Sequence, residues 1–329
     1  MSHRPPLHDL RAFESAIRRA LGSGNQAAAL EAATCGVEAA RQTGDGRAEW
    51  QFQFAAAEAL HALDRYRELL DLARSMGNSA VSARDNVIHA RSLTMEATAQ
   101  RCQGRTGPAL SAAQRALDLL QPIPEHAATR AKAYQTLIAA LVQAGRSDEA
   151  WSHHQELASL LDLELDDQTA GKGFWTLGNL AFFVTESDMG LDYHARASRL
   201  LSPANDIQLW ARFNRASADL QLQAGIAVDQ TRDCIDRALM AHEVTEPTEM
   251  DRIGLAETRA RWGLAVGQLS AADSVLAEAT AILEDSDAAY LVPAYRLWAE
   301  ILDALRPTDA ADKRAEANRI EGIAAANLS

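Results

Sequence analysis

The stretch GRTGPALSAAQRALDLLQP, residues 104–122, contains the two features that decide the fold of this chain. A glycine opens a short polar turn, and small residues then recur at Ala109, Ala113 and Ala116, on one face of a helix. An apolar segment of helical period precedes the turn. The stretch therefore predicts the second half of a helical hairpin, whose small side chains let another helix approach closely.

The same kind of turn recurs about every 40 residues along the chain. Its centres are Gly24, Asp64, Gly104, Gly145, Thr185, Gly225, Gly267 and Arg306, with spacings of 40, 40, 41, 40, 40, 42 and 39. Such a period indicates stacked helical hairpins, each of which buries its apolar face against its neighbours. We expect an all-α fold without strands, an α-solenoid of about eight antiparallel hairpins forming a single domain over residues 1–329. The expected hairpins span residues 7–43, 47–78, 86–121, 126–163, 168–202, 206–244, 249–285 and 289–326.

The prolines test these boundaries, because a proline inside a helix costs about 3 kcal/mol. Pro108 and Pro293 fit a first helical turn, where proline is tolerated, and Pro307 fits a turn. The prolines expected between hairpins are Pro122, Pro124, Pro203 and Pro247. The proline positions thus agree with the repeat.

Charge and composition narrow the class of protein. The net charge of −13, without a run of Lys and Arg, disfavours direct binding of nucleic acid. Prolines near the N-terminus and the lack of a long apolar stretch disfavour export and membrane insertion. Cys35, Cys102 and Cys234 lie far apart and are expected to be small buried residues. We expect a reduced, cytoplasmic protein.

No arrangement of residues predicts catalysis or a cofactor. His153 and His154 are adjacent, so they point about 100° apart on a helix and do not favour a metal site. The segment Gly171–Gly173 lacks the spacing of a phosphate-binding loop and is expected to loosen the link between the fourth and fifth hairpins. We expect a protein that is not an enzyme and binds neither cofactor nor metal.

The fifth unit carries the pattern of a known family. Phe174, Leu177 and Gly178 give a large residue, a leucine and a small residue, and Gly190 and Ala197 place small residues seven apart after the turn. The chain resembles tetratricopeptide-repeat proteins, in particular the variants with longer helices. This resemblance implies a right-handed superhelix with a concave binding groove.

The central stretch is more specifically similar to the repeat region of bacterial, above all actinobacterial, helix-turn-helix regulators. It runs from GKGFWTLGNLAFF, residues 171–183, to LWARFNRASADL, residues 209–220. The likeness implies that the repeats sense a peptide or a partner. Because the repeats begin by Leu10, we expect no DNA-binding domain in the sequence given.

In tetratricopeptide hairpins, the first helix exposes to the groove the positions two, three, six, ten and thirteen residues before the turn centre. In the upstream hairpins, this resemblance implies that Phe54, Glu58, Arg91, Thr94 and Lys132 face the groove. The residues predicted to bind a peptide or partner are Arg101, Gln135, Lys172, Trp175, Asn179, Phe182, Arg212, Arg215 and Asp219.

The chemistry of these residues suits an extended peptide. The amide of Asn179 both donates and accepts hydrogen bonds, and Arg212 and Arg215 suit a carboxylate such as a peptide C-terminus. Trp175 and Phe182 suit an apolar anchor. The alternative is that the aromatic residues are core and the polar ones are simply solvated.

We therefore predict a binding protein that captures a peptide or an extended protein segment, as a bacterial regulatory sensor or adaptor. One alternative is a structural scaffold that self-associates, with a homodimer as its simplest form. Others are a transcriptional regulator that lacks its own helix-turn-helix, and a helical enzyme such as a toroidal glycosidase.

Overall fold

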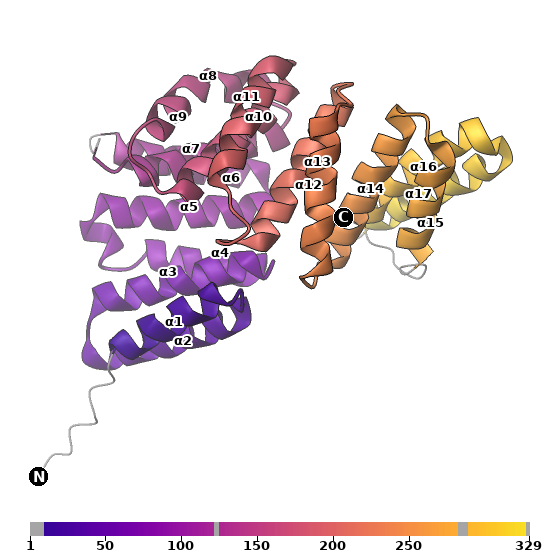
Figure 1. Ribbon diagram of the computed structural model, residues 1–329. Coiled ribbons are helices and arrows are strands. Elements are labelled where there is room, and N and C mark those ends of the chain that lie inside the picture. Colours follow the sequence, from indigo (N-terminus) through magenta and orange to yellow (C-terminus); the bar gives the residue numbers. More distant parts are fainter. Residues whose placement is uncertain (1–9, 122–124, 282–288, 327–329) are drawn as a thin grey trace, which may run out of the picture. The chain divides into compact units, whose positions relative to one another are not determined.

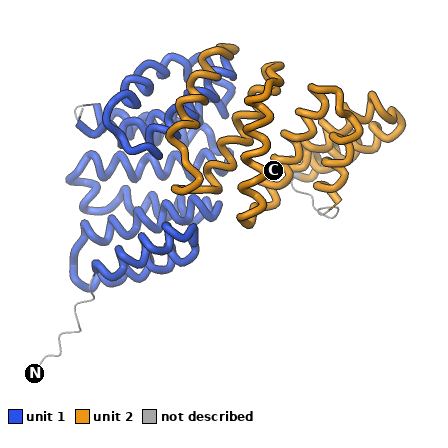
Figure 2. The backbone as a smooth tube through the Cα atoms, in the orientation of Figure 1, with its two compact units in different colours: residues 1–184 blue, residues 185–329 orange. Residues whose placement is uncertain are grey.

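The computed structural model describes residues 10–121, 125–281 and 289–326, and it contains only helices in these ranges (Figure 1). The all-α prediction is confirmed. The chain divides into two compact units, Met1–Val184 (unit 1) and Thr185–Ser329 (unit 2) (Figure 2). Each unit is described by itself, and the expectation of one continuous solenoid stays a prediction. Pro122 and Pro124 lie outside the described residues.

Unit 1 begins with four helical hairpins, and the second arm of the fourth is divided into two helices, α8 and α9. The pairs pack in sequence, and each first helix also contacts the helix before it. The helices are α1 (Leu10–Gly22), α2 (Gln26–Thr43), α3 (Gly46–Ala62), α4 (Tyr66–Gly77), α5 (Asn86–Cys102), α6 (Thr106–Leu120), α7 (Ala127–Gln143), α8 (Ser147–Ser152), α9 (His154–Leu161) and α10 (Asp167–Phe183).

Unit 2 contains the remaining helices, and the unit boundary falls at the turn within the fifth expected hairpin, between α10 and α11. The helices are α11 (Ser187–Leu200), α12 (Ile207–Gln223), α13 (Asp229–Glu243), α14 (Glu249–Ala265), α15 (Leu269–Ala281), α16 (Val292–Leu305) and α17 (Pro307–Ala326). Pro293 lies in the first turn of α16 as expected, whereas Pro307, expected in a turn, begins α17.

The turns between paired helices contain a residue with a left-handed backbone. In the third pair, φ at Gly104 is 74°, and the amide of Arg105 donates to the carbonyl of Gln100 at 2.9 Å. This hydrogen bond satisfies a carbonyl that the end of the helix would otherwise leave without a partner. Positive φ occurs at the predicted turn centres Gly24, Asp64, Gly104, Gly145, Thr185, Gly225 and Gly267. Arg306 differs, because its φ is −149°.

The second helix of the third pair packs through small side chains. Ala109, Ala113 and Ala116 are 0% exposed on α6, which packs along α5. Alanine has no rotamer entropy to lose, and its short side chain allows two backbones to come close. The small residues of the repeat thus determine how tightly the helices pair.

Two local predictions differ from the structure. Gly171 and Gly173 lie inside α10 rather than in a loose link. A Cβ at Gly173 would come within 2.3 Å of Leu161 Cδ2, so the glycine permits a close approach of α9 to α10. Cys35 is exposed, because it lies two residues after the buried Ala33 and so faces the other side of α2.

A chain of buried polar side chains links α11, α12 and α13. Ser217 Oγ lies 2.9 Å from His194 Nδ1, and Gln221 Nε2 donates to Ser217 Oγ at 3.1 Å. Thr231 Oγ1 then donates to Gln221 Oε1 at 2.7 Å. Burial lowers the pKa of His194 to about 4, so the ring is neutral at neutral pH. These bonds satisfy polar groups that water does not reach.

No helix in the part of the chain that the structure describes is long and apolar enough to span a bilayer.

The left-handed backbone at Thr185 leads to a stability prediction. L-residues are strained there by about 1–2 kcal/mol, and glycine is not. Thr185→Gly should raise the free energy of unfolding by ~1 kcal/mol. Gly225→Thr should lower it, because φ at Gly225 is 75° and no atom lies within 4 Å of the added Cβ. Urea unfolding followed by circular dichroism measures both changes, and equal stabilities in all three proteins would contradict the left-handed turns.

Candidate peptide-binding surfaces

Unit 1 contains a cavity of about 260 Å³ on its first helices. Its walls come from α3, α5, α7 and the beginning of α10, which are the first helices of four successive predicted hairpins. The lining residues are Phe54, Arg91, Thr94, Met95, Ala128, Thr129, Lys132, Asp166 and Thr169. We call this space the α3–α10 cavity.

Arg91 is the most unusual side chain of the α3–α10 cavity. Its guanidinium carbon lies 3.9 Å from the ring centroid of Phe54 and 5.0 Å from that of Trp50. The two rings are stacked with centroids 5.2 Å apart, and the Trp50 indole nitrogen donates to Ser92 Oγ at 3.1 Å. The floor under the guanidinium is therefore aromatic and fixed in place.

The charge of Arg91 is poorly compensated. Burial lowers the pKa of Arg91, and the charge of Glu58 acts in the opposite direction without reversing the shift. Among the described residues, no carboxylate forms an ion pair with Arg91. Glu58 instead lies 3.9 Å from Lys132 Nζ. A largely buried guanidinium that lines a cavity without a paired carboxylate favours an anionic group in that cavity.

The opposite side of the α3–α10 cavity supplies an acid and hydroxyls. Asp166 caps α10 and accepts a hydrogen bond from the Thr169 amide at 2.9 Å. Burial acts against ionisation of Asp166, but the hydrogen bonds from Thr169 and the charge of Lys132 hold its pKa below the usual value. The cavity therefore combines a cation, an anion and an apolar floor, which suits the mixed chemistry of a peptide.

Four residues of unit 1 that the resemblance placed toward the groove, Phe54, Arg91, Thr94 and Lys132, line this cavity, whereas Arg101 and Gln135 do not. Gln135 Nε2 donates to the carbonyl of Thr169 at 3.4 Å and so joins α7 to α10. Arg101 is half-buried near the end of α5, where its carbonyl accepts from Gln143 Nε2 at 3.1 Å. Both residues contact neighbouring helices of unit 1.

The four predicted residues of α10 form one stripe along that helix. Lys172, Trp175 and Asn179 are half-buried, whereas Phe182 is 9% exposed and belongs to the core. The side chain of Trp175 keeps its indole nitrogen out of solvent. Their spacing of three or four residues places them on one face, and the α3–α10 cavity meets α10 at its first turn.

In unit 2, the predicted residues of α12 meet charged residues of α14. Arg212 forms a forked ion pair with Asp251, with Nε–Oδ1 and Nη2–Oδ2 distances of 3.0 and 3.1 Å. Asp219 accepts from Arg261 Nε at 3.1 Å. The fork that the sequence suggested for a ligand carboxylate is thus engaged by a carboxylate of the chain itself.

Glu257 lies among these ion pairs on α14. Burial, together with the nearby charge of Asp219, raises the pKa of Glu257 to about 7, while Arg215 and Arg261 act in the opposite direction. Arg215 also covers Gly254, since a Cβ there would lie 3.1 Å from an Arg215 terminal nitrogen. These residues form a compact charged layer, the α12–α14 ladder.

The sequence carried a signal for part of this ladder. The groove positions counted back from Gly267 are Gly254, Glu257 and Arg261, so the same register applied to the seventh hairpin would have found them. Asp251, Met95, Asp166 and Thr169 lie outside that register. They depend on how neighbouring helices are offset, which a repeat pattern does not give.

Within residues 10–121, 125–281 and 289–326, no group of three or more His, Cys, Asp and Glu side chains is placed to hold a metal ion.

The fold defines the class of protein: paired helices, joined by a repeated left-handed turn, form a tetratricopeptide-like helical repeat. It is similar to the crystal structure of aspartyl phosphate phosphatase F from Bacillus subtilis, with a TM-score of 0.61 and 10% identity over 98% of this chain and 96% of that chain. A tetratricopeptide repeat protein from Parabacteroides merdae matches with a TM-score of 0.47 and 16% identity, over 83% of this chain and 92% of that chain. No protein-family model matches the sequence, and no curated protein does.

The α12–α14 ladder leads to a pH prediction. Between pH 4.5 and about 7 the Glu257 carboxyl is ionised in the unfolded chain but protonated in the folded one, so rising pH removes stability. Glu257→Gln should leave stability near pH 4.5 almost unchanged and raise it at pH 8, by on the order of 2 kcal/mol. Urea unfolding at both pH values measures this, with the exposed Glu300→Gln as control. A gain for Glu257→Gln that is independent of pH would contradict the raised pKa.

Proposed function

We propose that this chain is a binding protein whose α3–α10 cavity captures a peptide or an extended segment of a partner protein. The observation that carries the proposal is Arg91, a largely buried guanidinium that stacks on Phe54, lines the cavity and has no ion-pair partner among the described residues. A ligand carboxylate is the simplest group that would compensate this charge.

The surroundings of Arg91 restrict the kind of ligand. Phe54 and Met95 offer an apolar contact beside the guanidinium, and the hydroxyls of Thr94, Thr129 and Thr169 are polar neighbours. We infer a ligand that carries an acidic group, either a side chain or the free C-terminus, next to an apolar residue. Lys132 and Asp166 would contact the polar backbone of the same ligand.

The stripe on α10 extends this proposal beyond the cavity. Lys172, Trp175 and Asn179 are half-buried on one face of a helix whose first turn lines the cavity, which supports their role as further contacts for an extended chain. In unit 2 we assign Arg212, Arg215 and Asp219 to holding α12 against α14, because Arg212 and Asp219 are already paired there.

We infer a role as a bacterial regulatory sensor or adaptor in the cytoplasm. What supports this inference is the tetratricopeptide-like fold, which is typical of proteins that bind peptides and proteins. The similar Bacillus structure is called a phosphatase, and a fold shared at 10% identity does not carry that activity to this chain. Within this proposal the chain binds and does not catalyse.

Arg91 provides the direct test. Displayed libraries of short random peptides with free C-termini should yield ligands that are acidic beside an apolar residue. Arg91→Gln should weaken their binding by tenfold or more, about 1.4 kcal/mol, since the charge-assisted bonds are lost. Isothermal titration measures the affinities, and Arg105→Gln, at an exposed site away from the cavity, serves as the matched control. Unchanged affinity for Arg91→Gln would exclude this cavity as the site.

Asn179 and Arg212 distinguish a binding role from a structural one. Asn179→Ala should weaken the selected peptides severalfold without changing helicity. Arg212→Ala should instead lower the stability of unit 2, because it leaves Asp251 without its forked partner in a partly buried position. Circular dichroism and titration of both variants give the answer. If the Arg212→Ala protein is as stable as the parent but binds the selected peptides more weakly, Arg212 belongs to the ligand site rather than to the structural contacts of unit 2.

A further inference from the structure

Two cavities in unit 2 form one continuous trough. The first measures about 340 Å³ and the second about 290 Å³, and both are lined by Leu239, Arg259 and Val275. The walls are α13 and α15 and the floor is α14. We call this space the α13–α15 trough. It lies within unit 2 and shares no residue with the α3–α10 cavity of unit 1.

The trough is long enough for several turns of a helix. Its floor residues follow one another at three or four positions along α14, from Arg252 to Val266. Fourteen steps of 1.5 Å make a floor about 21 Å long. The wall residues also form single stripes, from Arg232 to Glu243 on α13 and from Ala271 to Ala279 on α15. Three parallel stripes of this kind are what a fourth helix packs against.

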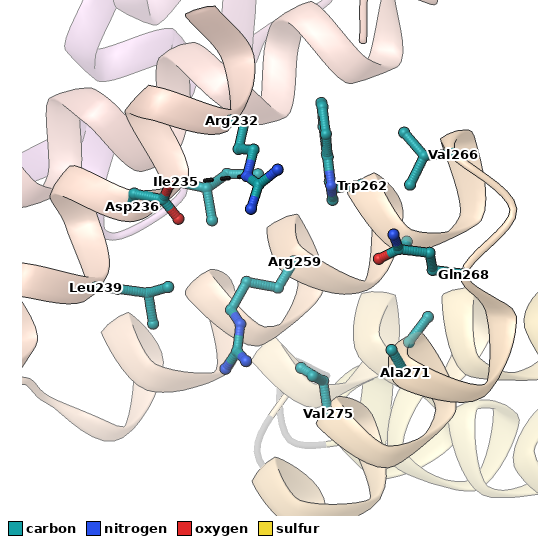
Figure 3. Close-up of a pocket in the computed structure, with 12 residues that line it drawn as sticks. Arg232, Ile235, Asp236, Leu239, Arg259, Trp262, Val266, Gln268, Ala271 and Val275 are labelled. Atoms are coloured by element: carbon teal, nitrogen blue, oxygen red, sulfur yellow. Dashed lines mark ion pairs between the residues drawn. The ribbon is translucent and has the colours of Figure 1, made fainter. Parts of the chain in front are cut away.

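The helix α13 packs less closely on α14 than α15 does. Trp262, Leu239 and Val275 are only half-buried, and Val266 is 39% exposed. Trp262, on the floor, lines the first cavity (Figure 3). A tryptophan in an apolar groove is the kind of residue that dominates the energy of a protein interface.

The charges of the trough differ between its two ends. Arg232 and Arg259 both line the first cavity, where Arg232 lies near Trp262 and Arg259 extends away from it (Figure 3). The carboxylate of Asp236 is 3.9 Å from Arg232 Nε, and no carboxylate of the described chain pairs with Arg259. The first cavity is therefore net positive on a chain whose net charge is −13.

At the other end, around Leu255, the acidic side chains outnumber the cationic ones once Arg259 is counted with the first cavity. Arg252 lies there with Glu243 and Glu278, and His242 is half-buried beside them with its pKa lowered by burial. The trough thus offers an apolar strip that is net positive in the first cavity and net negative beyond it.

We infer that the α13–α15 trough docks one amphipathic helix of a partner protein, with an apolar face toward Trp262 and Leu239 and acidic residues beside Arg232 and Arg259. In helix-in-groove recognition the bound helix supplies anchors at i, i+3 or i+4 and i+7, and a floor about 21 Å long is enough to receive them. The acidic flank complements the positive end and fixes the direction of the bound helix. This site is separate from the peptide site proposed for unit 1, so either one can fail without the other.

The test is a displayed library of single-helix peptides with randomised surface positions, selected against the full chain. The peptides recovered should be amphipathic, with Asp or Glu flanking the apolar face. Arg259→Glu and Trp262→Ala should each weaken their binding by tenfold or more. The matched control is Arg199→Glu, an exposed arginine of α11 outside the trough, which should bind as the parent does. Changing the peptide acids to Lys should restore binding to Arg259→Glu.

Three results would overturn the inference. They are the recovery of no helical binder, binders that tolerate both trough variants, and helices whose acidic and lysine-substituted forms bind the parent equally. Light scattering adds a separate check, since a parent dimer that Arg259→Glu dissociates would mean that a second copy of the chain occupies the trough. Circular dichroism confirms that the variants fold, and Trp262→Phe replaces Trp262→Ala if the smaller residue destabilises unit 2.

Discussion

The position of the left-handed turn determines which neighbouring helix each side chain of the preceding helix faces. Because Gly104 and its counterparts end the first helix of a pair at a fixed place, the distance of a residue from the turn decides which neighbour it meets. Arg91 lies thirteen residues before its turn and faces the aromatic floor of α3. Arg212 lies at the same distance before Gly225 and faces α14. Equivalent positions along the repeat therefore share an orientation while their partners differ.

The two arginines occupy equivalent positions of the repeat but lie in different environments. Arg212 meets Asp251 and forms a forked pair, so its charge contributes to the cohesion of unit 2. Arg91 meets Phe54 and Trp50 and keeps its hydrogen-bonding capacity toward the cavity. The first arrangement holds two helices together, and the second is the one for which we propose a ligand. One residue on a neighbouring helix can thus decide whether an arginine at this position of the repeat pairs within the protein or faces a cavity.

The fold was predictable because its determinants are local. Turn residues and small residues recur within each 40-residue unit, and the alanines of α6 are buried as their spacing indicates. For the candidate site in unit 1, the sequence predicted only which side chains face the groove. Arg91, Thr94 and Lys132 do line the α3–α10 cavity, but their pairing depends on residues of other helices. Asp251 is 39 positions from Arg212, and the offset between α12 and α14 that joins them is a property of packing.

The position of Arg91 over the rings of Phe54 and Trp50 has a consequence for the protein in solution. In the proposed site, small anions of the medium compete with an acidic ligand for the guanidinium held over Phe54. The strength of binding would accordingly depend on the salt of the cell or the buffer, although the apolar contacts with Phe54 and Met95 stay the same.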